Sequence, residues 1–335
     1  RDGSMHLPMR GTVARAVAVF AALWHLRLPL THIPSCCRAF VSSRSLRTSL
    51  RRTSLGCREA DQDWRDFRAR LVKLERKDSS PHRSTDASVG SLHAGGWAYP
   101  TSLVESGSLL LAQPGGFFGI RQPYFHKAVV LIFQEGPSGS LGIILNRPTA
   151  LRSTDFGLPG PGWPLWFGGD CYGLAKPAAR WEDLSLFCVH TIEALAPGSH
   201  EVVEGVYMIS FRAAQQLVGS GNAKVSDFLL FVGCCGWVKG QLQQELGMGI
   251  LWTLAAVDRR TLARELGRAR SPSRTARAEQ VSLDVGFTEW ERLYALLGTE
   301  FREQAEGWRL DGLFGDMRCR LWADENLLGR REWDL

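Results

Sequence analysis

The sequence predicts an α+β protein organised around a mixed β-sheet. From residue 107 to residue 257, eight short apolar runs have the length of strands and are rich in β-branched and aromatic residues. Glycine and proline separate these runs, and only two short helices are expected among them, so a regular βαβ repeat is not favoured. With 335 residues, of which 44% are hydrophobic, the chain can bury a large core.

The first 58 residues are expected to form an organelle-targeting leader. A short apolar run at residues 16–26 follows two arginines and has the length of a signal-peptide core, too short to span a bilayer. An acid-free segment rich in Arg and Ser comes next, as in transit peptides. This combination favours a plastid bounded by extra membranes, with a mitochondrion as the alternative. After removal of the leader we expect a soluble chain without a membrane span.

The basic excess of the chain lies in this leader. The formal net charge is +6, but residues 1–58 hold ten arginines and one acid, which leaves 30 basic and 33 acidic side chains in the remainder. Because contacts to phosphate need a basic face, nucleic acid is not expected as a partner.

A charged helix and a polar linker are predicted before the sheet. In residues 59–77, four apolar residues recur at steps of three and four and form one stripe on a helix: Trp64, Phe67, Leu71 and Leu74. We expect this stripe to pack on the main domain. Residues 78–96 read as a linker of the Ser, Gly and Pro type.

The main domain is expected at residues 97–300. A hairpin-like turn at 135–140 follows the second apolar run, and Ser210 is expected to cap one of the short helices. An amphipathic helix at 288–298 closes the domain. Residues 258–280 read as an Arg-rich, partly disordered insert, and residues 301–335 as a C-terminal extension without an assigned pattern. The eight runs are 108–113, 128–134, 140–146, 164–168, 184–192, 201–210, 227–233 and 250–257.

The usual catalytic and metal-binding signatures are missing from the sequence. No nucleophile elbow, phosphate-binding loop, dinucleotide fingerprint or H-E-x-x-H motif occurs, and the histidines outside the leader are scattered singly. The cysteines outside the leader are odd in number and contain no C-x-x-C pair, so neither a disulfide framework nor a zinc site is indicated. They are Cys171, Cys188, Cys234, Cys235 and Cys319. No catalytic residue, cofactor or metal site is therefore assigned.

Polar residues stand at the end of the run 140–146. Asn146 can close hydrogen bonds with the backbone where the strand ends, and Pro148 prevents further ladder pairing. Arg147 could clamp a carboxylate, either of the protein or of a bound anion. We interpret the three residues as a structural latch, with ligand binding as the alternative.

A glycine pair follows the next run. Gly168 and Gly169 allow a close-packed or left-handed backbone, and Asp170 is expected to cap what comes after them. The amides of this segment could instead form an anion-binding nest, but a tight turn is the favoured interpretation.

The segment 232–246 contains the best enzymatic candidates of the chain. Cys234 and Cys235 precede a helix, and a cysteine near a helix N-terminus gains thiolate character. Cysteines that follow buried strands are, however, commonly small core residues. The helix carries Gln241 and Glu245 on one face, and Trp237 before it is expected to staple the loop to the sheet, with contact to a partner as the alternative.

Taken in order, these segments resemble the YqgE/AlgH family of bacteria and plastids. The resemblance covers about residues 105–257, through stretches such as GSLGIILNRP, LWFGGD and FLLFVGCCGWVKGQLQQEL, and EWERLYALLG resembles the closing helix. The N-terminal helix followed by WAYP resembles an extension of the plant and algal branch. The chain departs from the family pattern at Asp170 and at the Cys234–Cys235 pair. The matching positions are Asn146, Arg147, Pro148, Gly168, Gly169, Gly236, Trp237, Gly240, Gln241, Leu242 and Glu245.

The resemblance implies a fold more than an activity. It implies a bifurcated, partly barrel-like sheet flanked by short helices, and no enzymatic activity is established for that family. We therefore expect a non-enzymatic binding or regulatory module whose partner is a protein. The alternatives are a cysteine-based enzyme or redox protein that uses Cys234 or Cys235, and a nucleic-acid-associated regulator, which is the label of one bacterial branch.

Overall fold

The computed structural model describes residues 64–78, 96–114, 118, 121–171, 184–269 and 285–328. The predicted leader and nearly all of the predicted linker lie outside these residues, as does the second half of the predicted insert. Among the described residues, no helix combines the length and the apolar character needed to cross a bilayer.

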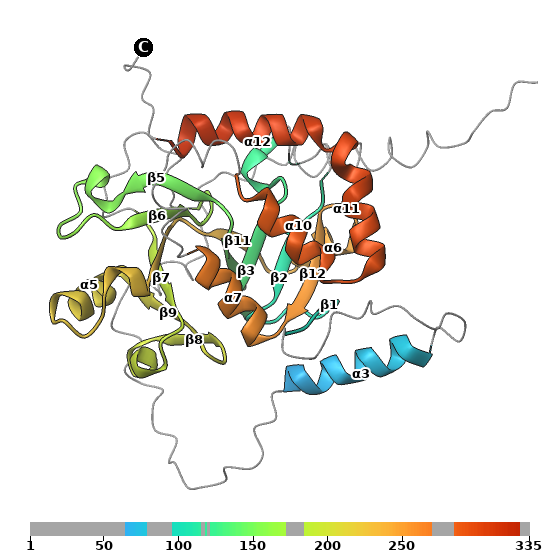
Figure 1. The fold of residues 1–335 in the computed structure, drawn as a ribbon, viewed down its shortest axis with the longest axis horizontal. Coiled ribbons are helices and arrows are strands. Elements are labelled where there is room, and N and C mark those ends of the chain that lie inside the picture. Colours follow the sequence, from blue (N-terminus) through green and yellow to red (C-terminus); the bar gives the residue numbers. More distant parts are fainter. Residues whose placement is uncertain are drawn as a thin grey trace, which may run out of the picture. The chain divides into compact units, whose positions relative to one another are not determined.

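Two six-stranded sheets form the centre of the described part, which confirms the α+β class (Figure 1). The sequence predicts a mixed, bifurcated sheet, and in the described residues the strands form two sheets without a closed barrel. Apolar runs identify strands but not the sheet that each strand joins. The first sheet is antiparallel throughout. Its strands, in spatial order, are β1 (Ala98–Pro100), β12 (Trp252–Val257), β2 (Leu109–Ala112), β3 (Val129–Gly136), β4 (Gly139–Ile144) and β11 (Cys235–Val238).

The second sheet is mixed, with β6 and β10 parallel and the other pairs antiparallel. The predicted run 201–210 is divided into two of its strands by a turn at Gly205, where φ is +76°. In spatial order the strands are β5 (Pro148–Arg152), β6 (Pro164–Phe167), β10 (Leu229–Val232), β7 (Leu186–His190), β9 (Val206–Ser210) and β8 (His200–Val203). The chain crosses from the first sheet to the second after β4, and returns after β10.

Three helices form where the sequence predicts them. In α5 (Phe211–Gly219) the side chain of Ser210 accepts a hydrogen bond from the amide of Ala213 and caps the helix. The other two are α6 (Gln241–Gly247) and α10 (Phe287–Ala295).

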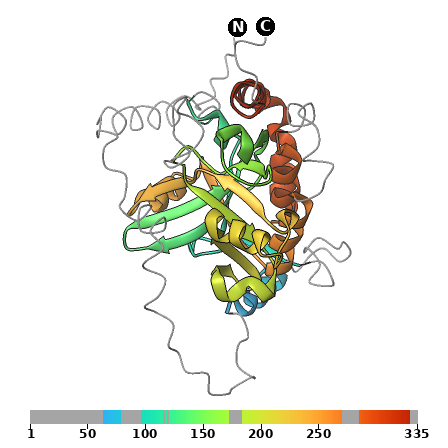
Figure 2. The ribbon, with the colours of Figure 1, turned by 90° about the vertical axis from the view of Figure 1, so that its left-hand side faces the viewer.

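The C-terminal third is more ordered than its sequence pattern indicates. The first half of the predicted insert is helix α7 (Arg259–Ala269), and the predicted extension contains α11 (Thr299–Asp311) and α12 (Leu313–Asn326). Seen from the side, these helices, coloured orange to red, lie along one flank of the strands (Figure 2). The fully buried residues of α12 are small, so no stripe of large apolar residues marks this helix in the sequence, although half-buried Trp322 packs its ring on Tyr124 and Phe167. The small buried residues are Gly315, Cys319 and Ala323.

The N-terminal helix α3 (Trp64–Asp78) packs on the domain with a face that the sequence analysis does not predict. The apolar stripe points to solvent, with 64% of Trp64, 38% of Phe67, 43% of Leu71 and 58% of Leu74 exposed. Ala69 is buried instead, in a cluster with Tyr99 and Ala256. The expectation that the stripe packs inward is therefore wrong, because polar contacts around Ala69 determine which face docks.

Candidate functional site

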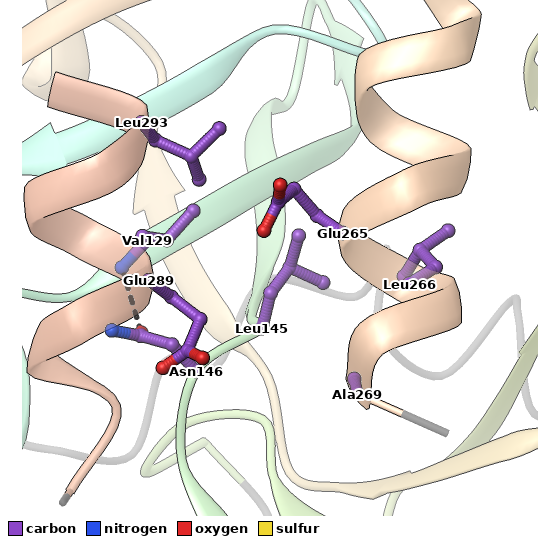
Figure 3. Close-up of a pocket in the computed structure, with 8 residues that line it drawn as sticks. All are labelled: Val129, Leu145, Asn146, Glu265, Leu266, Ala269, Glu289 and Leu293. Atoms are coloured by element: carbon purple, nitrogen blue, oxygen red, sulfur yellow. Dashed lines mark hydrogen bonds between the residues drawn. The ribbon is translucent and has the colours of Figure 1, made fainter. Parts of the chain in front are cut away.

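The predicted latch lies where the chain crosses from β4 to β5. Asn146 is buried, and its Oδ1 accepts a hydrogen bond from the amide of Val129 at 2.9 Å (Figure 3). Its Nδ2 donates to the carbonyl oxygens of Lys127 at 2.9 Å and Gly286 at 2.7 Å. One side chain thus joins the start of β3 and the residue before α10 to the crossing, which is the arrangement that the latch interpretation describes.

Arg147 extends the same latch through main-chain oxygens. Its side chain is fully buried, and its guanidinium donates to the carbonyl oxygens of Tyr124 at 3.1 Å, Val285 at 2.7 Å and Asn146 at 3.0 Å. A further hydrogen bond goes to the carbonyl of His126. The carbonyl dipoles of two turns therefore surround this buried cation, and the side chain projects into the protein instead of toward a ligand space.

Pro148 has a different role from the predicted one. The expectation that it prevents further ladder pairing is wrong, because Pro148 begins β5 and is paired with Trp166 of the second sheet. The carbonyl of Arg147 accepts from the amide of Phe167 at 2.9 Å, so pairing resumes at once in the other sheet. Proline, which has no N–H to donate, is tolerated here because β5 is an edge strand.

Gly168 and Gly169 lie between the two crossings. Gly168 donates from its amide to Val232 and accepts at its carbonyl from Ile144, both at 2.8 Å. A Cβ on Gly168 would collide with the carbonyl of Gly233. Gly169 has a φ of +153°, and a Cβ there would collide with the backbone of Cys234. The pair is thus a site of close backbone approach, as the tight-turn interpretation expects.

Asp170 accepts a hydrogen bond from the hydroxyl of Tyr124 at 2.5 Å. Burial, and secondly the charge of Asp170, raise the pKa of Tyr124.

Neither cysteine of the pair lies at a helix N-terminus. Cys234 and Cys235 are both buried, and α6 begins only at Gln241, with β11 in between. The thiol of Cys235 lies 3.5 Å from the carbonyl of Gly168, and burial raises its pKa well above the ordinary value. The prediction that a helix N-terminus would increase thiolate character is therefore wrong for Cys235.

The remaining motif positions converge on one carboxylate. Oε2 of Glu245 accepts hydrogen bonds from the indole N–H of Trp237 at 2.9 Å and of Trp252 at 2.8 Å. Oε1 accepts from the side-chain amide of Gln241 at 2.8 Å. Gly240 precedes α6 as its N-cap with a φ of +79°, a backbone conformation that glycine adopts readily. Together they fasten α6 to β11 and β12, so Trp237 staples the loop as predicted.

A buried ion cluster that the sequence analysis missed fastens α12. His126 is fully buried, and its Nε2 lies 2.7 Å from Oδ1 of Asp316, which also lies 2.9 Å from Nζ of Lys127. Burial, chiefly, lowers the pKa of His126. Burial alone would raise the pKa of Asp316, but hydrogen bonds from His126 and Lys127 outweigh it and lower that pKa. Neutral His126 thus donates a hydrogen bond to an ionised Asp316. In the sequence, the adjacent His126 and Lys127 in FHKAVVLIF are the signal that could have indicated this cluster.

A small pocket lies between α7, α10 and the ends of β3 and β4 (Figure 3). Asn146 lines it, whereas Arg147, Gly169 and Trp237 do not. Its free space of about 20 Å³ has room for a water molecule, not for a metabolite. One wall is Glu265, which is buried and forms ion pairs with Arg268 and Arg292. The motif positions therefore serve as latches and do not converge on this pocket.

Comparison with known sequences identifies relatives of the domain. A family model described as AlgH-like matches residues 109–270. A UPF0301 protein of Chlamydia trachomatis is 31% identical over 159 residues, which cover 47% of this chain and 77% of that protein. A UPF0301 protein of Chlorobium luteolum is 28% identical over 179 residues, covering 52% of this chain and 86% of the relative. The matched residues run from β2 to α7.

A solved structure is similar to part of the chain. The solution structure of the AlgH protein from Pseudomonas aeruginosa has 18% identity and a TM-score of 0.36, covering 58% of this chain and 93% of that protein.

Proposed function

The chain belongs to the AlgH-like family, and from that premise we propose that it acts as a non-enzymatic binding module for another protein. The observation that carries the proposal is the apolar stripe of α3, which faces solvent while the opposite face of the helix is fixed to the domain. We further propose that the partner contributes an amphipathic helix whose apolar seam is bordered by acidic residues.

Polar contacts fix the rotation of α3 about its own axis, so its apolar stripe cannot turn toward the domain. Nη2 of Arg68 donates to both carboxylate oxygens of Glu105 at 2.7 Å, and Nε of Arg65 lies 3.1 Å from the same group. On the other flank, the indole of Trp97 donates to Asp66 at 2.7 Å. Rotation of the helix would break all of these contacts, so the exposure of the stripe is built into the docking of α3.

The spacing of the stripe fits a second helix. Steps of three, four and three residues from Trp64 to Leu74 place the four apolar side chains at the a and d positions of two heptads, which is the seam of a coiled coil. The rings of Trp64 and Phe67 already stack with centroids 5.1 Å apart. A seam of this length would accept about three turns of a partner helix in all.

The charge of α3 selects the partner. Arg65, Asp66 and Arg68 are used in contacts to the domain. In the heptad that places Trp64 at a, the e and g positions beside the seam are Arg68, Arg70, Glu75 and Lys77, three basic and one acidic by sequence. Because flanking charges choose coiled-coil partners, acidic residues beside the partner's seam complement this helix.

A designed peptide tests this function. The probe is a fluorescein-labelled amphipathic helix with leucine at its a and d positions and glutamate beside them, titrated with the full chain and followed by anisotropy. Replacing both Leu71 and Leu74 by Glu should weaken binding at least tenfold, because each leucine buried at the seam contributes about 1.5 kcal/mol or more. A peptide with lysine in place of glutamate should also bind more weakly.

The matched control is Leu103→Glu, which replaces another exposed leucine, 49% exposed and outside α3. It should leave the affinity unchanged. Equal binding of the wild-type chain and the double variant, or no binding of the acidic peptide, contradicts the proposed function.

We also propose that this module works in a plastid, with a mitochondrion as the alternative, on the composition of residues 1–58. A fluorescent protein fused after residue 58 should co-localise with chlorophyll autofluorescence in an algal or plant cell. Diffuse fluorescence throughout the cytosol would contradict this location.

A further inference from the structure

Cys171 and Cys234 face each other across an isolated antiparallel bridge. The amide of Cys171 donates to the carbonyl of Cys234 at 3.0 Å, and the amide of Cys234 donates back at 3.1 Å. In such a hydrogen-bonded pair the two Cα atoms lie about 5.5 Å apart. Native disulfides join Cα atoms that are about 4.4–6.8 Å apart. The main chain therefore already holds the two Cα atoms within the range that a disulfide can bridge.

The two thiols lie on the same side of this bridge. Directly opposite residues of a ladder project to one face, and Gly236, two residues after Cys234, belongs to that face. Sγ of Cys171 lies 3.8 Å from the position that a Cβ on Gly236 would occupy. Cys171 is half-buried, whereas Cys234 is buried. The thiol of Cys171 thus lies beside the space that Gly236 leaves open, on the face to which the ladder directs Cys234.

Among the other described cysteines, Cys235 lies near enough to Cys171 for their charges to interact, but none is paired across the bridge from it. Cys235 projects from the opposite face of its strand, with Sγ 3.5 Å from the carbonyl of Gly168. Cys188 is fully buried in β7, and Cys319 is fully buried in α12. Burial raises the pKa of each of these three thiols.

We propose that Cys171 and Cys234 form a reversible dithiol–disulfide switch that a small-molecule disulfide operates. The Cys171 thiolate attacks one sulfur of the small disulfide, forms a mixed disulfide and expels one thiolate. The Cys234 thiolate then attacks the sulfur of Cys171 and expels the second thiolate. The two protein thiols lose two electrons and two protons, and the small disulfide takes them up as two free thiols.

The position of the bond indicates what the switch does. Cys171 follows the segment after β6 of the second sheet, and Cys234 lies on the crossing to β11 of the first. Opposite Cβ atoms in a ladder lie about 4.5–5.5 Å apart, farther in hydrogen-bonded pairs, while a disulfide needs about 3.5–4.5 Å. Closure therefore pulls the two segments together, and a bond under such tension is easily reduced. Oxidation would clamp the crossing, and reduction would release it.

The test uses the reduced full chain equilibrated with glutathione disulfide and mapped by non-reducing peptide mass spectrometry. Among the described cysteines we expect a single linked peptide pair, containing Cys171 and Cys234, which disappears when reduced glutathione is added in excess. Cys171→Ser should abolish the link, and Cys234→Ser should leave glutathione attached to Cys171. The matched control Cys235→Ser should still form the link.

The variants also separate failure of the proposal from failure to fold. Circular dichroism of each serine variant reports the fold, and the half-buried Cys171→Ser is the mildest change. Loss of the link in Cys235→Ser with its retention in Cys234→Ser would show that Cys235 is the partner and overturn the proposal. A wild-type chain that folds but stays unmodified, or that keeps glutathione on Cys171 without closing, would also overturn it.

Discussion

Removal of the Asn146 side chain is the sharpest test of the latch. Asn146→Ala deletes three buried hydrogen bonds to the main chain, at 2.9, 2.9 and 2.7 Å. The amide of Val129 loses its side-chain acceptor, and a buried unsatisfied donor costs about 1–3 kcal/mol. Each of the two carbonyls loses one bond, worth about 0.5–1.5 kcal/mol. The free energy of unfolding should therefore fall by about 4 kcal/mol.

Equilibrium unfolding in urea, followed by tryptophan fluorescence and circular dichroism, measures this loss as a lower midpoint at an unchanged m-value. The matched control is Asn222→Ala, the same chemical change at an exposed site where the amide donates to Ser220. The control should change the free energy by about 0.5 kcal/mol or less. If Asn146→Ala costs no more than its control, the crossing does not depend on this side chain and the latch interpretation fails.

Three further predictions concern α12, its ion cluster and α6. Gly315→Ala should destabilise the docking of α12 by about 1–3 kcal/mol, measured by urea unfolding and amide hydrogen exchange, because a Cβ there would overlap the ring of His126. Acidification below about pH 6.5 should lower the free energy of unfolding by up to about 1.4 kcal/mol per pH unit, since burial lowers the pKa of His126 and the unfolded chain binds the proton more readily. Asp316, whose pKa is also lowered in the fold, should add a second loss below about pH 3.9. Glu245→Ala should cost about 1–3 kcal/mol in urea unfolding because it strips the acceptor from two indoles and an amide.

Each of these changes has a matched control. Gly307→Ala, in the middle of α11 with nothing near the added methyl, should stabilise the protein by about 0.5–1 kcal/mol, opposite in sign to Gly315→Ala. His126→Gln should flatten the pH dependence near pH 6, and His200→Gln at an exposed site should not. Gln244→Ala, exposed on the same helix as Glu245, should be nearly neutral. Equal effects at the paired sites would contradict the assigned contacts.

Strands buried on both faces were predictable, and the sheet to which each belongs was not. Runs such as β2 and β12 are apolar at nearly every position and buried along their whole length. Short strands that combine few apolar residues with glycine or proline, such as β1 and β11, give no such signal. Pairing partners are set by contacts remote in sequence, for example Ala98 with Val257, and one sequence does not reveal them.

The sequence did not identify which face of a helix docks on the domain, and the reason is physical. The apolar stripe of α3 is conspicuous, yet the ion pair from Arg68 to Glu105 and the fit of Ala69 determine which face docks. In α12, large residues such as Phe314 and Leu321 are exposed, and the small residue Gly315 packs against the ring of His126. Periodicity of large apolar residues therefore located a helix without identifying its docked face in one case, and missed a helix in the other.

The positions that resemble family motifs cluster at the two crossings between the sheets. Asn146 and Arg147 hold the first crossing. Gly168 is hydrogen-bonded to the strands that lead into the two crossings, through Ile144 of β4 and Val232 of β10. Residues used this way specify how one chain builds two sheets, and their side chains are occupied within the protein. Recognition of a partner must then use surfaces that these latches leave open. The stripe of α3, which lies outside residues 109–270 matched by the family model, is such a surface. Variation of function within the family would on this argument follow the added helices, while the crossings stay the same.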